Sequence, residues 1–412
     1  MRAMASGRAR AAAALLLTAL LAGCGGGGGG SAPPPPPNLP VLQSNQLLVT
    51  VEQNPAISAI APTTATVNVP YVTVTLCDTS GHCKSIDHVV VDTGSYGLRV
   101  LQSAVAGLNL PADSVVTGSG TTASLGECVG FLSGHMWGSV THASLQMASE
   151  TTAALPVQVI GASDLPAASA TPCNSPGPDV GTLQGIGGNG LLGIGPFVGD
   201  AGTYYACSAG VCTALAGPPS GERVVNPVAS IVNTTDTNGV VLQMPAVPDA
   251  GAPLAYGTLS FGVDTQADNA TSGLAAIPLD SSGYLVVTAM GTAYPQSFTD
   301  SGSNFYFAPF GSSIPTDSQQ HFIPSSLLTL PITLASAGGA AYPTSLQSQM
   351  LIDNYSSMNF AVNLAFNDIG AAISSGSLGV DLGMPFFYGK RVAYVIDRQP
   401  SALGSGPLVA MD

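Results

Sequence analysis

The chain has 412 residues, of which 45% are apolar and only 8% are charged, and its formal net charge is −14. Disorder normally combines low hydrophobicity with high charge, so this composition excludes a disordered chain and predicts a globular body large enough for two lobes. The negative charge argues against nucleic acid as a partner, because phosphates would be repelled.

Residues 1–23 are predicted to be a signal peptide. Three arginines in the first ten positions precede an apolar stretch over 11–22 that is too short for a permanent membrane helix. The stretch ends in Leu21-Ala22-Gly23-Cys24, which resembles the bacterial lipobox, where the signal is cut before a Cys that receives lipid. The alternative is an ordinary signal peptide with an incidental Cys24.

The resemblance to the lipobox implies a location in the bacterial cell envelope. Position 25 is Gly rather than Asp, which favours anchoring in the outer membrane, facing the periplasm or the exterior. Residues 24–45 then form a tether, with flexible glycines at 25–30 and stiff prolines at 33–37. The lipid bilayer is therefore an expected partner, reached through Cys24.

Six cysteines follow Cys24, and an even number in an exported protein predicts disulfides. Two pairs flank short turns and are expected to bond locally, which leaves the remaining two cysteines to each other. The expected bonds are Cys77–Cys83, Cys207–Cys212 and Cys128–Cys173.

No metal or cofactor is expected. The chain has no Cys-x2-Cys motif, and its five histidines are scattered. His135 and His142 lie in strand-like sequence, so we interpret them as ordinary polar positions.

Most of the chain after residue 45 is predicted to form strands. The runs are rich in β-branched or aromatic residues and are bounded by turn formers. They are Leu47–Val51, Pro70–Leu76, His88–Val91, Val157–Ile160, Val240–Met244, Thr258–Phe261, Tyr284–Thr288 and Val392–Ile396. Short helices are predicted only near 103–108 and 324–328.

Two similar motifs lie 208 positions apart. The first is Val89-Val90-Val91-Asp92-Thr93-Gly94-Ser95 and the second is Phe298-Thr299-Asp300-Ser301-Gly302-Ser303. A glycine-containing apolar run follows each of them, at 190–195 and 377–383, where glycine would let another backbone pass closely. This coarse repeat predicts an N-terminal lobe over 46–265 and a C-terminal lobe over 266–412.

In the order of these motifs the chain resembles pepsin-like aspartic peptidases. The resemblance covers roughly residues 46–400 and includes Leu382-Gly383-Met384-Pro385-Phe386-Phe387 near the C-terminus. It implies a mostly β, bilobal double β-barrel with a cleft between the lobes. With the lipobox and the low charge, the whole chain also resembles a family of bacterial lipoproteins known as a domain of unknown function.

The resemblance implies that Asp92 and Asp300 are catalytic and hydrolyse peptide bonds of a polypeptide substrate. Like charges about 3 Å apart cannot both ionise easily, so the pair would share one proton and activate a water. The neighbouring hydroxyl and glycine residues would hold the pair in place. They are Thr93, Gly94, Ser95, Ser301, Gly302 and Ser303.

Several alternatives remain open at this stage. Each Asp-Ser/Thr-Gly tripeptide is also compatible with a plain turn, and Asp353 competes with Asp300 as the second aspartate. Arg99 replaces an aromatic residue of the family, and residues 124–140, where a covering flap is expected, contain Phe131 and Trp137 but no Tyr. An active endopeptidase, an inactive binding module and a structural lipoprotein therefore all remain possible, each expected to be a monomer.

Overall fold

The computed structural model describes residues 38–118, 120–166, 173, 177–337, 345–373 and 379–412. The predicted signal peptide, Cys24 and the tether up to residue 37 lie outside the described residues. Residues 37–412 belong to one compact unit. No helix of the described residues is long and apolar enough to cross a membrane.

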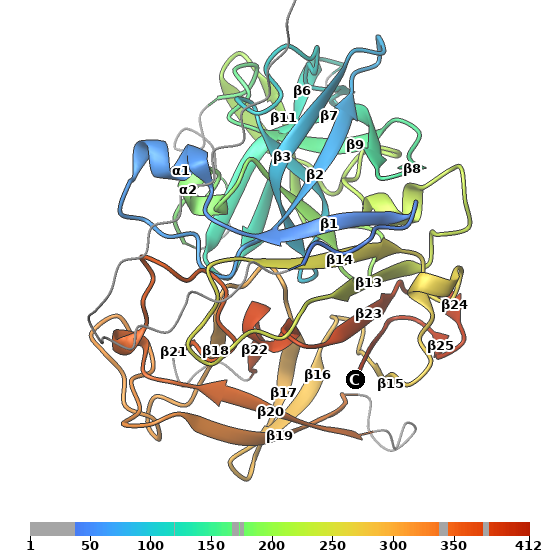
Figure 1. The fold of residues 1–412 in the computed structure, drawn as a ribbon. Coiled ribbons are helices and arrows are strands. Elements are labelled where there is room, and N and C mark those ends of the chain that lie inside the picture. The colour runs from blue at the N-terminus through green and yellow to red at the C-terminus, as the bar shows by residue number, and fades with distance from the viewer. Residues whose placement is uncertain (1–37, 119, 167–172, 174–176, 338–344, 374–378) are drawn as a thin grey trace, which may run out of the picture. The chain divides into compact units, whose positions relative to one another are not determined.

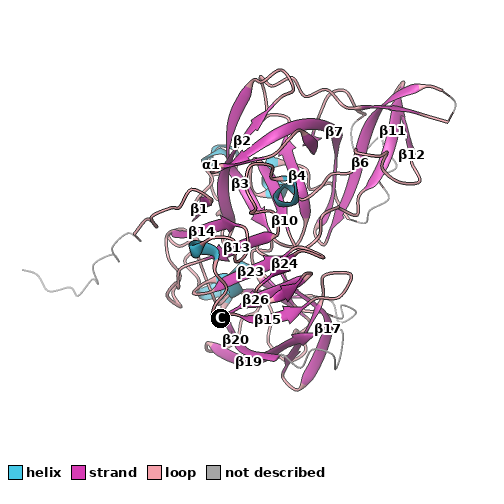
Figure 2. Ribbon diagram, turned by 90° about the vertical axis from the view of Figure 1, so that its right-hand side faces the viewer, coloured by secondary structure: helices cyan, strands magenta, loops and turns pink. Residues whose placement is uncertain are grey.

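The described chain is mostly β, as predicted, and its helices are short (Figure 2). The strands of the N-terminal half are β1 (Gln46–Val51), β2 (Pro70–Cys77), β3 (Cys83–Asp92), β4 (Tyr96–Leu101), β5 (Ser114–Val116), β6 (Thr122–Phe131), β7 (Gly134–Met147), β8 (Glu150–Thr151), β9 (Leu155–Ile160), β10 (Gly190–Ile194), β11 (Thr203–Ser208), β12 (Val211–Ala214), β13 (Gly239–Gln243) and β14 (Ala255–Phe261).

The strands of the C-terminal half are β15 (Ala275–Pro278), β16 (Leu285–Ala289), β17 (Thr292–Thr299), β18 (Tyr306–Ala308), β19 (Leu328–Ser336), β20 (Ser345–Ile352), β21 (Gly370–Ala372), β22 (Asp381–Leu382), β23 (Arg391–Val395), β24 (Pro400–Ser401), β25 (Gly404–Ser405) and β26 (Leu408–Met411). The helices are α1 (Pro55–Ile60), α2 (Leu183–Ile186), η2 (Pro227–Ser230), η3 (Ala267–Asn269), η4 (Tyr355–Ser357) and η5 (Met384–Phe387).

Each of the eight predicted strand runs matches a strand to within one residue at its ends or lies inside it, but both predicted helices are wrong. Residues 103–108 form turns, and 324–327 lead into β19 without a helix. The helix α1 forms instead because the side chain of Asn54 accepts hydrogen bonds from the backbone N–H groups of Ala56 and Ile57, and Pro55 fits the first helical position. Here the capping residues, rather than the periodicity of apolar residues, determine where the helix forms.

The C-terminal end of β3, Val89–Asp92, begins the first motif and is buried on both sides. Val89 and Val91 pack in the main apolar core, whereas Val90 packs in a second cluster with Tyr71 and Leu191. Successive strand side chains point to opposite faces, so a run of three valines suits a strand covered on both faces. Burying each such side chain contributes roughly 1.5–3 kcal/mol.

Strand pairings close a ring in the N-terminal half. The order is β2, β3, β10, β4, β9 and β7, and β7 pairs again with β2. In the C-terminal half, β16–β22 form a separate 7-stranded sheet, and no ring of pairings is recorded among its described residues. The second barrel of the expected double barrel, like the cleft, stays a prediction.

The two halves share a sheet. β14 pairs with β13, and β13 pairs with β23 from the C-terminal half, as the adjacent strands in Figure 1 show. β23 in turn pairs with β26, which pairs with β15. The predicted division at residues 265 and 266 falls between β14 and β15 and stays a prediction, because pairing continues across it.

All three predicted disulfides are confirmed. Cys77–Cys83 joins β2 to β3, Cys207–Cys212 joins β11 to β12, and Cys128–Cys173 joins β6 to Cys173, 45 positions along the chain.

Candidate active site

The two motifs form loops of the same construction at the ends of β3 and β17. In the first, the Gly94 N–H donates to Asp92 Oδ1 at 2.8 Å, and the Ser95 hydroxyl donates to Asp92 Oδ2. In the second, the Gly302 N–H donates to Asp300 Oδ1 at 2.8 Å, and Ser303 Oγ lies 2.9 Å from Asp300 Oδ2. Each carboxylate is therefore oriented by the residues two and three positions after it.

In each half, a third strand pairs with the two strands that flank the loop. β10 lies between β3 and β4, so the first loop crosses its end, and β22 lies likewise between β17 and β18. A Cβ on Gly193 would lie 2.6 Å from the Tyr96 nitrogen, and one on Gly383 would lie 2.6 Å from the Ser303 oxygen. Only glycine permits this approach, which is the role that the sequence predicts for these apolar-glycine runs.

Hydrogen bonds join the two loops directly. The Ser301 N–H donates to Thr93 Oγ1 at 2.9 Å, and the Thr93 N–H donates to Ser301 Oγ at 3.2 Å. Ser301 Oγ itself donates to the Val91 carbonyl at 2.7 Å. Thr93 and Ser301 are both buried, so these bonds are shielded from water and fix the loops against each other.

The loops bring the two carboxylates together. A Cβ on Gly94 would lie 2.6 Å from Asp300 Cγ, and a Cβ on Gly302 would lie 2.8 Å from Asp92 Oδ1 and 3.1 Å from Asp300 Oδ1. The two Oδ1 atoms are thus no farther apart than the sum of these last distances. One water with hydrogen bonds of about 2.5–3.0 Å to each can span this separation.

Burial raises the pKa of the Asp300 carboxyl well above its usual range, and the nearby Asp92 carboxylate raises it further. A raised pKa favours the protonated form of the Asp300 carboxyl. Asp92 is buried, with 5% of its surface exposed, whereas the tips of both loops, Gly94 and Gly302, are exposed. Solvent reaches the pair from the glycine side.

A third carboxylate, Asp381 on β22, lies beside the pair. Its Oδ2 is 2.6 Å from Ser303 Oγ, its other oxygen has no hydrogen-bond partner in the part of the chain that the structure describes, and burial raises its pKa well above the usual range. A hydroxyl has one proton and Ser303 Oγ faces two carboxyl oxygens, so it donates to only one of them. A protonated Asp381 that donates to Ser303, which then donates to Asp300, satisfies both contacts.

Arg99 supports the first loop from the core. Its side chain is 1% exposed, and its Nη1 donates to the Tyr96 carbonyl at 2.6 Å. Its Nη2 contacts Glu127 Oε1 at 3.0 Å and Asp200 Oδ2 at 2.7 Å. Arg99 is thus the centre of a buried ion network beneath the first loop.

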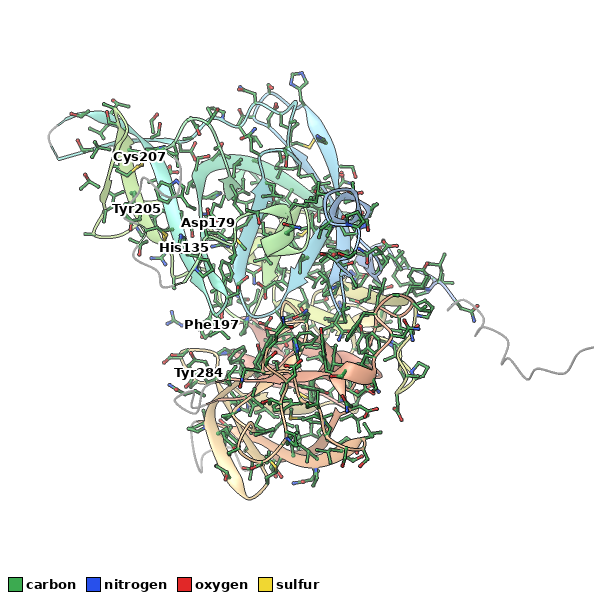
Figure 3. All side chains as sticks on the ribbon, turned by 90° about the vertical axis from the view of Figure 1, so that its left-hand side faces the viewer. His135, Asp179, Phe197, Tyr205, Cys207 and Tyr284 are labelled. Atoms are coloured by element: carbon green, nitrogen blue, oxygen red, sulfur yellow. A yellow bond between two sulfur atoms is a disulfide. The ribbon has the colours of Figure 1, made fainter. Side chains whose placement is uncertain are left out.

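The two halves approach each other beside Tyr96, where a Cβ on Gly283 would lie 3.3 Å from Phe197 Cε2 and 3.7 Å from the Tyr96 hydroxyl oxygen. The ring of Tyr96, which follows Ser95, packs edge-on against Phe197 at 5.6 Å. Burial raises the pKa of Tyr96, and the Asp92 and Asp300 carboxylates raise it further. Figure 3 shows Phe197 of the N-terminal half across from Tyr284 of the C-terminal half, far from Tyr205 and Cys207 at the outer edge.

Two sequence alternatives lie elsewhere. Asp353 follows β20, where its backbone N–H donates to the Asp368 carbonyl at 2.7 Å, so it does not join the aspartate pair. Trp137 packs edge-on against Tyr205 at 5.3 Å, and its Nε1 donates to the Pro166 carbonyl. Trp137 therefore serves packing.

Sequence reasoning missed Asp381 and Tyr96. A signal for Asp381 exists, because it is the one acidic residue in the apolar run before Gly383. Tyr96 gives no such signal, since only the packing of Phe197 shows where its ring lies.

Comparison with known proteins gives a family. Residues 42–411 match the family model described as "Protein of unknown function (DUF3443)". Among solved structures, the chain is similar to the aspartic proteinase from Irpex lacteus, with 14% identity, a TM-score of 0.45, and coverage of 89% of this chain and 96% of that one. No curated protein matches the sequence. The lipoprotein character expected for the family stays a prediction. Because the family model spans most of its length, the chain belongs to the DUF3443 family of proteins of unknown function.

Proposed function

We propose that this protein is an aspartic-type endopeptidase, held at the bacterial envelope through Cys24, in which Asp92 and Asp300 activate one water to hydrolyse peptide bonds. The observation that carries the proposal is the exchange of hydrogen bonds between Thr93 and Ser301. It connects two loops of equal construction and leaves their carboxylates facing one shared space.

The chemistry follows from the protonation of the pair. Asp92 takes a proton from the water as the water oxygen attacks the peptide carbonyl carbon. The proton on Asp300 is transferred to the carbonyl oxygen, which stabilises the tetrahedral intermediate. When the C–N bond breaks, Asp92 returns its proton to the leaving nitrogen, and Asp300 recovers its proton as the carboxyl product forms.

Asp381 and Ser303 would keep Asp300 ready for this role. Asp381 stays protonated because an ionised form would leave a buried, charged oxygen without a partner. Its proton is directed at Ser303 Oγ, so the Ser303 proton points at Asp300 Oδ2. Because Asp300 Oδ2 accepts the Ser303 proton, the catalytic proton of Asp300 would lie on Oδ1.

The test is cleavage of a denatured protein by the full chain across acidic to neutral pH. Asp92→Asn and Asp300→Asn should each lower the rate by at least about 10²–10⁴-fold, the usual contribution of a general acid or base. A transition-state mimic with a hydroxyl in place of the attacked carbonyl should inhibit. Asp353→Asn is the matched control and should keep wild-type activity. Full activity in either dyad variant would refute the assignment.

A binding module without hydrolysis is the second candidate. The hairpin of β6 and β7 has Leu132 and Ser133 at its turn, and residues 124–140 contain no Tyr. A protein that binds polypeptides and cleaves none at any pH would support this candidate. In that case, Asp92→Asn would change binding affinity and produce no change in fragment patterns.

A further inference from the structure

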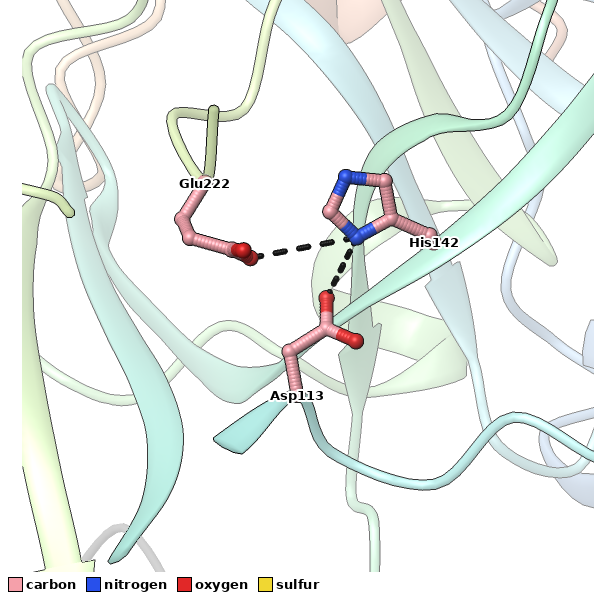
Figure 4. A group of neighbouring side chains, drawn as sticks. All are labelled: Asp113, His142 and Glu222. Carbon is pink, nitrogen blue, oxygen red and sulfur yellow. Dashed lines mark hydrogen bonds and ion pairs between the residues drawn. The ribbon is translucent and has the colours of Figure 1, made fainter. Parts of the chain in front are cut away.

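Three potential metal ligands converge outside the aspartate pair. Asp113 precedes β5, His142 lies on β7, and Glu222 lies in the loop between β12 and η2 (Figure 4). His142 Nδ1 is 2.7 Å from Asp113 Oδ2 and 3.8 Å from Glu222 Oε2. One ligand atom from each residue lies within 4.8 Å of the other two.

The backbone holds Asp113 and His142 in position before any ligand binds. The Asp113 N–H donates to the Val140 carbonyl at 2.8 Å, and the Asp113 carbonyl accepts from the Leu125 N–H at 2.8 Å. His142 lies inside the ladder between β7 and β9. Glu222 is placed by a turn in which its N–H donates to the Pro219 carbonyl at 3.1 Å. The site is therefore built on paired strands and adjusted by one loop.

The hydrogen-bonding needs of these three side chains favour a bound cation. Glu222 Oε2 is buried and has no hydrogen-bond partner among the described residues, although it points at His142 Nδ1. Both carboxylates face the same ring nitrogen, so a single proton on His142 can satisfy only one of them. A metal ion at this position would be bound by all three side chains at once.

We propose that Asp113, His142 and Glu222 bind one Zn²⁺ ion. One imidazole nitrogen and two carboxylate oxygens are ligand types that zinc accepts at about 2.0–2.2 Å, with water in the remaining position. Calcium and magnesium prefer oxygen ligands alone, so the histidine selects against them. His142 also lines a surface hollow of about 420 Å³ together with Gly221 and Arg223, so this residue of the site borders open space.

The ion would fasten a loop to the N-terminal barrel. Glu222 is followed by Arg223, whose Nη1 donates to the Asp200 carbonyl, and Asp200 is a member of the ion network around Arg99. Metal binding at Glu222 would thus hold the loop that supports this network. The expected consequence is added stability of the folded protein, because zinc would bind the folded chain in preference to the unfolded one.

The test is titration of the metal-free full chain, without an added histidine tag, with zinc chloride by calorimetry and thermal unfolding. We expect one Zn²⁺ per chain and a higher Tm, with no effect of calcium or magnesium. His142→Ala and the milder Glu222→Gln should each weaken binding at least about 10–100-fold, the loss that outer-shell changes already cause.

His82→Ala is the matched control. His82 contacts a single carboxylate, Asp78, at 3.5 Å and is exposed, so its loss should leave zinc affinity unchanged. Absence of zinc binding would overturn the proposal and leave the cluster as a contact of His142 with two carboxylates. Binding that survives both His142→Ala and Glu222→Gln would overturn it as well, because the ion would then lie elsewhere.

Discussion

Thr93 and Ser301 each donate a backbone N–H to the side-chain oxygen of the other, at 3.2 and 2.9 Å, although 208 positions separate them. Because the exchange is reciprocal, a shift of either loop would break both hydrogen bonds between them. It is the contact through which two distant parts of the chain set the geometry of Asp92 and Asp300.

Loss of this exchange should reduce both stability and activity. Thr93→Val leaves the buried Ser301 N–H without a partner, which costs about 1–3 kcal/mol. Urea unfolding should show this loss, and the cleavage rate should fall because the carboxylates separate. Thr333→Val removes an exposed threonine hydroxyl that contacts Gln347, and should change the free energy of unfolding by less than about 0.5 kcal/mol. Equal effects of the two substitutions would contradict a special role for Thr93.

Asp381→Asn should preserve activity and improve stability near neutral pH. The amide can donate to Ser303 as the protonated carboxyl does, whereas Asp381→Leu removes the donor and should lower the cleavage rate.

The stability effect has a defined sign. Burial raises the pKa of Asp381 well above its usual value, so above about pH 4 the unfolded chain loses this proton more readily than the folded one. Wild-type stability therefore falls relative to Asp381→Asn as pH rises from about 4. Thermal unfolding at a series of pH values measures this, and a difference independent of pH would show that Asp381 is ionised in the folded protein.

Arg99→Met should be strongly destabilising. It leaves the buried carboxyls of Glu127 and Asp200 without their cation, and breaking such a buried pair costs about 3–5 kcal/mol. Arg398→Met is the control, because that side chain is 90% exposed and its contact with Asp397 is a surface ion pair. Urea unfolding of both variants tests the difference. A loss for Arg99→Met no larger than that for Arg398→Met would show that the network adds nothing.

Asp368 should make stability depend on pH between about 4 and 7. Burial, and then the charges of Asp353 and Asp249, raise its pKa to about 7. The contribution of Asp368 to the free energy of unfolding is fully present below its unfolded-state pKa near 4. It is lost as pH rises to its folded-state pKa of about 7. The advantage of Asp368→Asn in thermal unfolding should grow across that range and then level off. Asp353→Asn removes a charge that raises the pKa of Asp368, so the pH at which the stability difference levels off should fall. An unchanged pH would argue against the proximity of Asp353 and Asp368.

Much of the site follows from local sequence, and the rest depends on long-range pairing. The run Val89–Val91 before Asp92 predicted its strand because β-branched residues bounded by turn formers leave few other choices. The place of Asp381 could not be predicted, because only the parallel pairing of Phe298 with Asp381 brings it to Ser303.

Arg99 shows the same limit in another form. Arginine is usually exposed, so the sequence alone suggests a surface position for it. Its buried partners, Glu127 on β6 and Asp200, are brought together only by the fold. The three disulfides were predictable because two of them join cysteines only six and five positions apart, which fixed the third by elimination.

The measurement that tests the central claim most directly is the cleavage rate of Asp92→Asn, Asp300→Asn and the double variant on one denatured protein. Residues that act as a unit show non-additive losses. If the two carboxylates share one water, each single variant should lose about as much as the double variant. Independent, multiplying losses, or a wild-type rate in either single variant, would contradict the account.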